Sequence, residues 1–377
     1  MLATGAAADP LNNHHHFREG ADMGGDRRDL LRIVNSVAPM RICDNGGWTD
    51  TWFACQGRIF NIAVQPYAQV QMRVRRAQAG PSRITIHAEN YGQRYVRDVP
   101  EGTYLKHPLL EAAIDYMRIP PGLSLEFSVY SECPSGCSTG TSAAVSVAMI
   151  GALDRLTHRW MTPHEVAMAA HRIETELLGQ QCGIQDQIAS AYGGISFIEM
   201  HQYPHAMVSQ IRLPEPLWWE LESRLTLVFV GLSHSSSEVH KKVIARLQRE
   251  GSSAPVLDRL RRAAEQAKEA LYAADLPALG RSMIENTQAQ GELHPELVGP
   301  GHARIIEIAR ACGALGWKVN GAGGDGGSVT LLSGADRSGR RAMIRQIEQD
   351  NPSFRHIPIY LSAQGLRVWE SPVQGEA

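Results

Sequence analysis

Alternating apolar and polar positions recur through the first third of the chain and predict half-buried β-strands. The alternation is clearest at residues 60–64, 68–74 and 123–130, where every second side chain is apolar. This periodicity places one set of side chains on the core face of a sheet and the other set toward solvent. Further strands are expected at 32–34, 38–42 and 84–86, and helices at about 108–117 and 142–155.

A helix over residues 162–178 carries the strongest local signals. Thr162 can cap the first turn, Pro163 suits the first helical position, and Glu165 completes a capping box. Apolar side chains recur on one face of the segment, and Gly179 suits the position at which the helix ends.

Two prolines within residues 213–216 (LPEP) mark a change of composition and predict a domain boundary. The run that follows at 225–232 is typical of a buried strand. Helices and strands are then expected at 237–250, 256–273, 276–290, 302–312, 317–320, 328–332, 336–349 and 354–361. The whole pattern predicts an α+β protein with a mobile extension at 1–30 and two domains, at 31–214 and 215–377.

Composition and charge narrow the class of protein. The 377 residues are 43% apolar and 20% charged, with a formal net charge of -2, which argues against a general nucleic-acid binder. No apolar run reaches the roughly 18 residues of a membrane-spanning helix, and no signal peptide is expected. The six cysteines form no Cys-x-x-Cys pair, which favours reduced thiols in a cytoplasmic enzyme. No coiled-coil repeat is present, and a monomer or homodimer is expected.

Residues 134–144 (PSGCSTGTSAA) are small, flexible and rich in hydroxyls, and they lead directly into an apolar helical segment. Glycines let a backbone approach an anion closely, and the unpaired amides at a helix start point toward it. No Gly-Lys-[Ser/Thr] follows, so the segment is not a Walker A loop. It predicts a phosphate-binding loop of another kind.

This loop is one of four ordered segments that together resemble the GHMP kinases, the superfamily of galactokinase, homoserine kinase, mevalonate kinase and phosphomevalonate kinase. The segments are residues 39–51 (PMRICDNGGWTDT), 134–144, 182–187 (CGIQDQ) and 318–327 (KVNGAGGDGG). Arg41 and Thr49-Asp50 match the first family motif, residues 134–143 the second, and residues 321–326 the third. The resemblance covers about residues 36–363.

The resemblance implies a ribosomal-protein-like α+β N-terminal domain beside a ferredoxin-like C-terminal domain, with ATP and an acceptor between them. It also implies Mg²⁺ held by Ser142 and Glu174, with Thr141 and Glu176 as alternative ligands. ATP is expected against Pro134, Ser135, Gly136, Cys137, Ser138, Thr139, Gly140, Thr141, Ser142, Gly323 and Gly324. The acceptor is expected against Trp48, Thr49, Asp50, Gly183 and Gly194.

Asp186 matches the family aspartate beside the acceptor hydroxyl, and Arg41 matches the arginine expected next to it. Phosphoryl transfer has a loose transition state, so orienting the hydroxyl matters more than complete proton removal. The guanidinium would offset the charge that develops on the transferring group. These two residues are therefore expected to be catalytic.

Two branches of the superfamily share local patterns with this chain. The segment Gly-Gly-Trp-Thr-Asp-Thr at 46–51 is similar to L-fucokinases, whereas residues 183–187 with the glycines at 193–194 resemble D-glycero-D-manno-heptose 7-phosphate kinases. Both groups phosphorylate an anomeric hydroxyl, and the chain length favours the heptose kinase type. Candidates for holding a distal phosphate are His87, Lys106 and Arg172. A non-sugar alcohol as acceptor, and a catalytically silent sensor of sugar and ATP, are the alternatives.

Three departures from the family pattern bear on activity. Ser138-Thr139 stands where relatives usually have Gly-Leu, which predicts an altered backbone path near the phosphates. Asp325 replaces a small residue, and its carboxylate would be unfavourable near phosphates unless it points outward or toward Mg²⁺. Gly47-Trp48 replaces the Glu-His of galactokinases, which makes galactose a poor candidate substrate.

Overall fold

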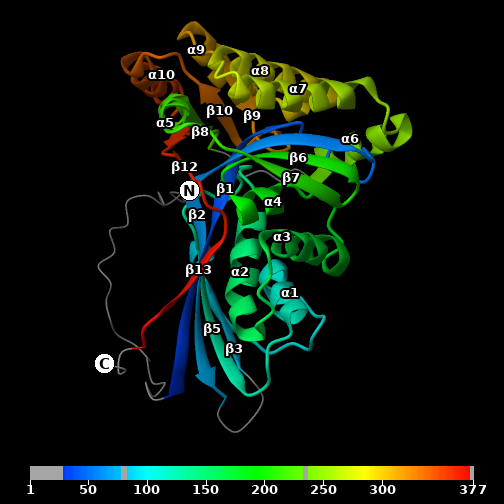
Figure 1. The fold of residues 1–377 in the computed structure, drawn as a ribbon, viewed down its shortest axis with the longest axis vertical. Helices are drawn as coiled ribbons and strands as arrows, with labels where there is room; N and C mark the ends of the chain where they lie inside the picture. Colours follow the sequence, from blue (N-terminus) through cyan, green and yellow to red (C-terminus); the bar gives the residue numbers. More distant parts are fainter. Residues whose placement is uncertain (1–28, 78–82, 232–236, 374–377) are drawn as a thin grey trace, which may run out of the picture.

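The structure, a computed structural model, describes residues 29–77, 83–231 and 237–373. Its described strands form a nine-stranded sheet and a four-stranded sheet. Figure 1 shows the long strands of the large sheet in the lower and middle parts of the molecule, with the small sheet and a group of helices at the top. Most of the extension predicted at 1–30 lies outside the described residues.

The large sheet is organised by one long strand, β2 (Gly57–Arg76), which pairs antiparallel with β1 (Leu30–Asn45). The second half of β2 pairs with β5 (Leu123–Ser131), and its first half pairs with β6 (Ile195–Gln202). The main hydrogen-bonded order is β13-β1-β2-β5-β3-β4. The other strands are β3 (Ile84–Ala88), β4 (Gln93–Arg97), β7 (His205–Ile211), β12 (Tyr360–Leu361) and β13 (Arg367–Ser371).

Four helices cover one face of the large sheet (Figure 1). They are α1 (Pro108–Met117), α2 (Thr141–Thr157), α3 (Pro163–Arg172) and α4 (Gln185–Tyr192). Helix α2 contacts β1, β2 and the three other helices, and its Val147, Met149 and Ile150 are fully buried. One wider helical turn, Ile173–Leu177, continues α3. The apolar face of α2 thus fixes the helix whose start carries the predicted phosphate loop.

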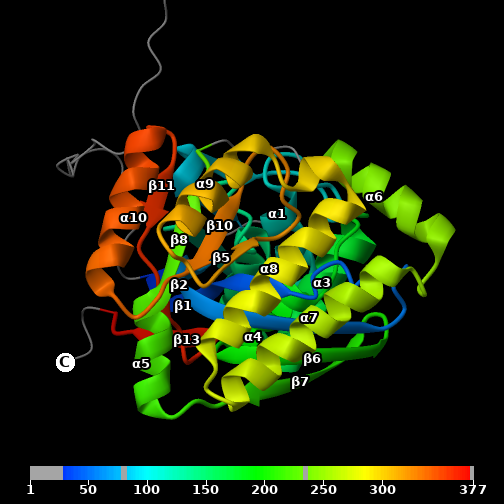
Figure 2. The ribbon, with the colours of Figure 1, turned by 90° about the horizontal axis from the view of Figure 1, so that it is seen from above.

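The small sheet has the antiparallel order β11-β8-β10-β9. Its strands are β8 (Leu225–Phe229), β9 (Gly316–Val319), β10 (Ser328–Leu332) and β11 (Arg355–Ile357). The accompanying helices are α5 (Glu215–Arg224), α6 (Ser237–Glu250), α7 (Pro255–Tyr272), α8 (Leu276–Leu293), α9 (Pro300–Ala311) and α10 (Arg337–Asp350). Figure 2 shows α7 and α8 side by side across β1 and β2, and both helices contact β1. They join the two sheets.

The predicted fold class and most predicted elements are confirmed. The capping box at Thr162 is present, with Glu165 N donating to Thr162 Oγ1 at 3.3 Å. The strands expected at 32–34 and 38–42 form one continuous strand, β1, and the strand expected at 354–361 is divided between β11 and β12 in different sheets. The β6–β7 hairpin, α4, α5, β4 and β13 were not predicted.

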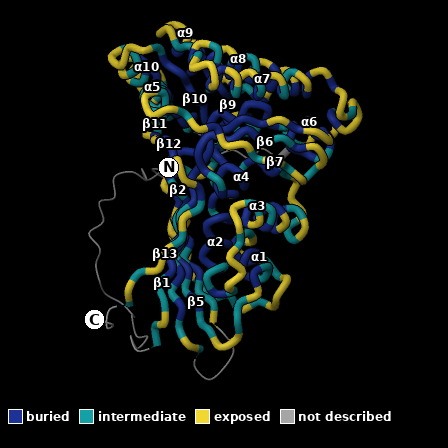
Figure 3. Tube along the Cα trace, viewed as in Figure 1, coloured by how far each residue is buried: buried dark blue, intermediate teal, exposed yellow. Residues whose placement is uncertain are grey.

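Burial follows this architecture. Figure 3 shows buried residues along the centre of the large sheet and around β9 and β10, and exposed residues on the outer sides of α7 to α10. Both β12 and β13 follow the small sheet in sequence yet pair with β2 and β1. The domain limits at 214 and 215 stay predictions. In the described ranges, every helix is too short or too polar to cross a bilayer.

Candidate active site

Two cavities meet where the two sheets approach each other. The first, the loop cavity, has a volume of about 540 Å³ and is lined by residues 135–142 together with Asn90, Tyr91 and His107. The second, the carboxylate cavity, has about 190 Å³ and is lined by four acidic side chains, those of Asp44, Asp50, Glu174 and Asp186. Residues shared by both linings are Arg41, Ser142, Asp186, His240, Gly321 and Ala322. A group bound in one cavity therefore lies next to a group bound in the other.

The predicted phosphate loop wraps around the first turn of α2. Gly136, Ser138 and Gly140 adopt left-handed backbone conformations, with φ of 77°, 59° and 73°. Helix α2 begins at Thr141, so its first amides lack partners within the helix and open toward the loop cavity. Such a helix start favours an anion through both its N–H groups and the helix dipole. Ser138 thus adopts the backbone conformation that glycine favours.

A pair of substitutions tests whether this conformation matters. If this loop binds ATP, as the family resemblance implies, Ser138→Gly should leave the KM for ATP within about twofold of the parent value, because glycine adopts positive φ readily. Ser138→Val is expected to raise it about tenfold, because a β-branched side chain at positive φ is strongly disfavoured. Steady-state kinetics on both variants checks this. Equal KM values for the two variants would contradict it.

Arg41 and Asp186 form an ion pair at the junction of the cavities. Arg41 Nε donates to Asp186 Oδ1 at 2.7 Å, Nη2 donates to Oδ2 at 3.3 Å, and Nη1 donates to the carbonyl of Ser138 at 2.5 Å. Arg41 is buried in β1, whereas the Asp186 side chain on the first turn of α4 is 31% exposed. Burial opposes the charge on Arg41, but Asp186 and Asp44 outweigh it, so the pKa of Arg41 is raised. The guanidinium joins the phosphate loop to the carboxylate.

Asp50 lies in the carboxylate cavity under a tight turn. Its Oδ2 accepts a hydrogen bond from Gln185 N at 3.0 Å, and a Cβ on Gly183 would overlap its carboxylate. Burial raises the pKa of Asp50 to about 6; the Gln185 amide opposes this rise and the charge of Asp186 adds to it. Thr49 is fully buried and donates to the carbonyl of Gly46 at 2.7 Å. Gly183 and Thr49 therefore shape the position of Asp50.

The raised pKa of Asp50 predicts how acceptor use depends on pH. A carboxylate that accepts hydrogen bonds from acceptor hydroxyls must be ionised, so kcat/KM for the acceptor should fall as the pH drops through about 6. Asp50→Asn should lower kcat/KM about 100-fold at neutral pH and make the acidic limb shallower, because the contribution of Asp50 near pH 6 is lost. A pH–rate profile of both proteins checks the prediction, and an unchanged acidic limb in the variant would contradict it.

Stability offers an activity-free check on the same group. The pKa of Asp50 in the folded protein is raised above its ordinary 3.8. Protonated Asp50 therefore stabilises the folded state, fully so below pH 3.8, and this stabilisation is lost as the pH rises through about 6. Asp50→Asn should thus raise the melting temperature more at about pH 8 than at about pH 5. A stabilisation of equal size at both values would place the pKa elsewhere.

Glu174 and Ser142 supply oxygen donors on the same cavity wall. Glu174 lies in the wide turn after α3, is 5% exposed, and accepts a hydrogen bond on Oε1 from Gln187 Nε2 at 2.7 Å. Burial raises the pKa of Glu174 to about 7, which the Gln187 bond opposes and the charge of Asp186 increases. The described residues contain no cluster of three His, Cys, Asp or Glu side chains suited to a metal. One carboxylate and one hydroxyl fit Mg²⁺, which takes its other ligands from water and substrate phosphates.

Other predicted residues lie elsewhere. Gly323 and Gly324 pack against the turn Pro295–Leu297, with Gly324 N donating to Leu297 O at 3.1 Å, and it is Gly321 and Ala322 that line the cavities. Gly194 bonds the backbone of residues 63 and 362, away from both cavities. Pro134 and Thr49 support the linings without joining them. Asp325 is exposed and outside both cavities, so its carboxylate points outward.

Several lining residues were not predicted. Asn90, Tyr91 and His107 close the far end of the loop cavity from a short turn and a loop, where no motif marks them. Trp52 and Phe53 line the carboxylate cavity next to the predicted Trp48, and the Trp48 ring contacts the His240 ring edge-on at a centroid distance of 5.1 Å. Of His87, Lys106 and Arg172, each of which the structure describes, none lines the carboxylate cavity.

Comparisons with known proteins agree with this geometry. Residues 107–194 match the family model described as GHMP kinases N terminal domain. The chain is 24% identical over 304 residues to a D-glycero-alpha-D-manno-heptose 7-phosphate kinase of Campylobacter jejuni, spanning 78% of this chain and 88% of that one. It is 31% identical over 260 residues to a mevalonate kinase of Thermococcus gammatolerans, spanning 66% and 70% respectively.

A solved structure has the same fold. The crystal structure of a D-glycero-D-manno-heptose 1-phosphate kinase from Bacteriodes thetaiotaomicron superposes with a TM-score of 0.69 and 21% identity, covering 89% of this chain and 98% of that one. The sequence matches and the shared fold identify the family of this chain. The chain belongs to the GHMP kinases.

Proposed function

We propose that this protein is an ATP- and Mg²⁺-dependent sugar kinase that phosphorylates the anomeric hydroxyl of a sugar or sugar phosphate, of the D-glycero-D-manno-heptose 7-phosphate type. The observation that carries the proposal is the Arg41–Asp186 ion pair, 2.7 Å from Nε to Oδ1, at the junction of the two cavities. The similarity to a heptose 7-phosphate kinase supports the choice of acceptor.

The loop cavity is the proposed ATP site and the carboxylate cavity the proposed acceptor site. The α2 amides and residues 135–142 would hold the triphosphate, with its γ-phosphoryl group directed toward Asp186. Asp50 and Trp48 would contact the sugar. Mg²⁺ held by Ser142 and Glu174 would neutralise charge on the phosphate oxygens.

Asp186 orients the acceptor hydroxyl and receives its proton. As the acceptor oxygen bonds to the γ-phosphorus, the bond from that phosphorus to the bridging oxygen breaks and ADP leaves. Arg41 is buried and already paired with Asp186, so it supplies positive charge without reorganisation as negative charge develops. Proximity of two bound substrates across a shared wall accounts for much of the expected rate gain.

A free sugar, as in L-fucokinases, is the second candidate acceptor. Within the described part of the chain, the basic side chains that line the carboxylate cavity are those of Arg41 and His240. Arg41 is already bonded to Asp186 and Ser138, so a distal phosphate would have few cations to bind there. This observation favours an unphosphorylated sugar, and it is the point at which the two acceptors differ.

Coupled measurement of ADP release across a panel of sugars, each with and without a distal phosphate, tests the proposal. Turnover of a heptose 7-phosphate, with phosphate found on the anomeric oxygen by NMR, is the expected result. Turnover of the free sugar alone would favour the second candidate. ATP and sugar binding without turnover of any acceptor would identify a silent sensor and overturn the kinase proposal.

The proposal also covers the cellular location and the oligomeric state. All six cysteines are free thiols, which supports a cytoplasmic location. A monomer or homodimer is proposed, with the domains divided near residue 214 and the two cavities at their junction.

A further inference from the structure

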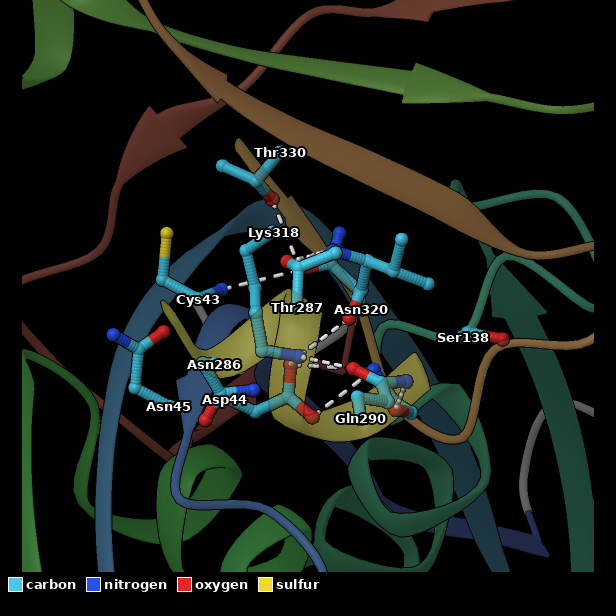
Figure 4. A network of polar contacts seen from close by, with 12 residues as sticks. Cys43, Asp44, Asn45, Ser138, Asn286, Thr287, Gln290, Lys318, Asn320 and Thr330 are labelled. Atoms are coloured by element: carbon cyan, nitrogen blue, oxygen red, sulfur yellow. Dashed lines mark hydrogen bonds and ion pairs between the residues drawn. The ribbon is translucent and has the colours of Figure 1, made fainter. Parts of the chain in front are cut away.

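Lys318 is a fully buried lysine beside the site, and Figure 4 shows its ammonium at the centre of a polar network. Its Nζ donates to Asp44 Oδ1 and to Gln290 Oε1, each at 3.2 Å, and to the carbonyl of Val319. An ammonium has three donors, and all three are used here. Burial lowers the pKa of Lys318, and the Asp44 carboxylate opposes that change.

Asp44 is the counter-ion, 1% exposed at the end of β1. Its carboxylate also accepts the Gly321 amide at 3.2 and 3.0 Å, and lies 3.9 Å from Arg41 Nη2. Burial alone would raise the pKa of Asp44, but the charges of Lys318 and Arg41 hold it below its ordinary value. One carboxylate therefore contacts two cations that reach it from different sheets.

Gly321 is held at both of its peptide groups by partners of Lys318. Its N–H donates to Asp44, and its carbonyl accepts from Gln290 Nε2 at 3.0 Å. Gly321 lines both cavities, has a φ of 58°, and would place a Cβ only 3.0 Å from the carbonyl of Ser138. The ammonium thus holds the side chains of Asp44 and Gln290, which fix the Gly321 peptide against the phosphate loop.

A second branch of the network reaches the same loop. Asn320 Oδ1 accepts from Cys43 N at 3.2 Å, and Asn320 Nδ2 donates to Ser328 Oγ at 3.0 Å. Ser328 Oγ in turn donates to the carbonyl of Cys137 at 2.6 Å. Backbone from β1, from the glycine segment after β9 and from the phosphate loop is therefore held together beside Lys318.

We propose that Asp44 and Lys318 are a positioning pair for phosphoryl transfer, which fixes Arg41 and Gly321 relative to each other. The proposal rests on the kinase function proposed above. An ion pair buried this completely seldom adds stability over apolar side chains of similar size, because desolvation offsets the attraction. Its place between the catalytic arginine and the cavity-lining glycine gives it a role in turnover. Neither residue needs to contact a substrate for this.

The double variant Asp44→Leu/Lys318→Met removes both charges together. Its kcat is expected to fall about 100-fold, because small displacements of catalytic groups have effects of that size. Its KM for the acceptor is expected to change less than its kcat, because Asp50 and Gly183 are untouched, although Asp44 itself lines the carboxylate cavity. Hydrogen exchange of the amides at 320–327 in the free protein is expected to become faster.

The matched control is another buried ion pair, Arg97–Asp115, whose Nη2 and Oδ2 atoms are 2.8 Å apart and which lines neither cavity. Arg97→Met/Asp115→Leu should keep kcat within about threefold of the parent value and leave the exchange at 320–327 unchanged. The variant Asp44→Asn/Lys318→Met, which keeps an acceptor for the Gly321 amide, should recover part of the protection.

A parental kcat in the double variant, or an equal loss of kcat in the control, would overturn the proposal. Gln290→Met provides an independent test if the double variant does not fold, because it keeps both charges paired. It should lower kcat about tenfold and speed exchange at 320–327, and the absence of both effects would also overturn the proposal. If the parent protein turns over no sugar, the kinase function fails, while the exchange measurement still decides the role of the pair.

Discussion

Asp186→Asn is expected to lower kcat by a factor of about 1,000 or more. The amide keeps the size of the side chain and can still accept one hydrogen bond from Arg41. It cannot take a proton from the acceptor hydroxyl, and it brings no negative charge to orient that hydroxyl. Such a loss corresponds to about 4 kcal/mol of transition-state stabilisation.

Single-turnover and steady-state kinetics together check this expectation, because they separate chemistry from product release. The KM for ATP should change less than about threefold, since the loop cavity is otherwise intact. Asp325→Asn is the matched control: Asp325 is an exposed aspartate in the glycine segment outside both cavities, so its variant should keep the parental kcat. Activity retained in Asp186→Asn would remove Asp186 from the proposed mechanism.

The pattern of the chain predicted the elements that have strong local signals. The start of α3 follows from Pro163 and the Thr162 cap, and the observed bounds of α1 agree with the expected ones. Strand β13 has no such signal: its five residues are mostly exposed or half-buried, and it forms by pairing with β1 more than 300 positions earlier. The hairpin of β6 and β7 likewise depends on pairing with β2. Tertiary partners decide these segments, so local propensity could not.

The candidate site likewise contains residues that the motifs identify and residues that only the tertiary structure identifies. The motifs named Arg41, Asp186, Asp50 and Glu174, and the structure brings all four to the carboxylate cavity. The same motifs contain Asp44 and Lys318, for which the sequence predicts no role. Lysine side chains are mostly exposed in proteins. Only the packing of β9 against the end of β1 makes that lysine buried and paired.

Ser138 stands where the family pattern has a glycine, and it has a φ of 59°, as a glycine would favour, between two glycines that are also left-handed. The altered backbone path expected near the phosphates stays a prediction. Its carbonyl accepts from Arg41 and its side chain packs near Gly327. The surrounding contacts hold the serine in a conformation that it seldom adopts by itself.

Arg41→Lys is expected to lower kcat by a factor of about 100 to 1,000, although the positive charge is retained. A single ammonium cannot reach both oxygens of Asp186 and the carbonyl of Ser138, which the guanidinium bonds through three nitrogen atoms. Asp186 would then be free to turn away from the acceptor. Arg41→Met should be no more than about tenfold worse than Arg41→Lys, because the geometry of the fork matters more than its charge.

Folding should survive both changes, since Asp44 keeps Lys318 as its partner at 3.2 Å. Arg97→Lys provides the control, because Arg97 makes a similarly buried two-bonded contact to Asp115 away from the cavities. It should lower the melting temperature and leave kcat within about twofold of the parent. If Arg41→Lys instead kept the parental kcat while Arg41→Met lost it, charge alone would account for the arginine. The orienting role proposed for its contact with Asp186 would then be wrong.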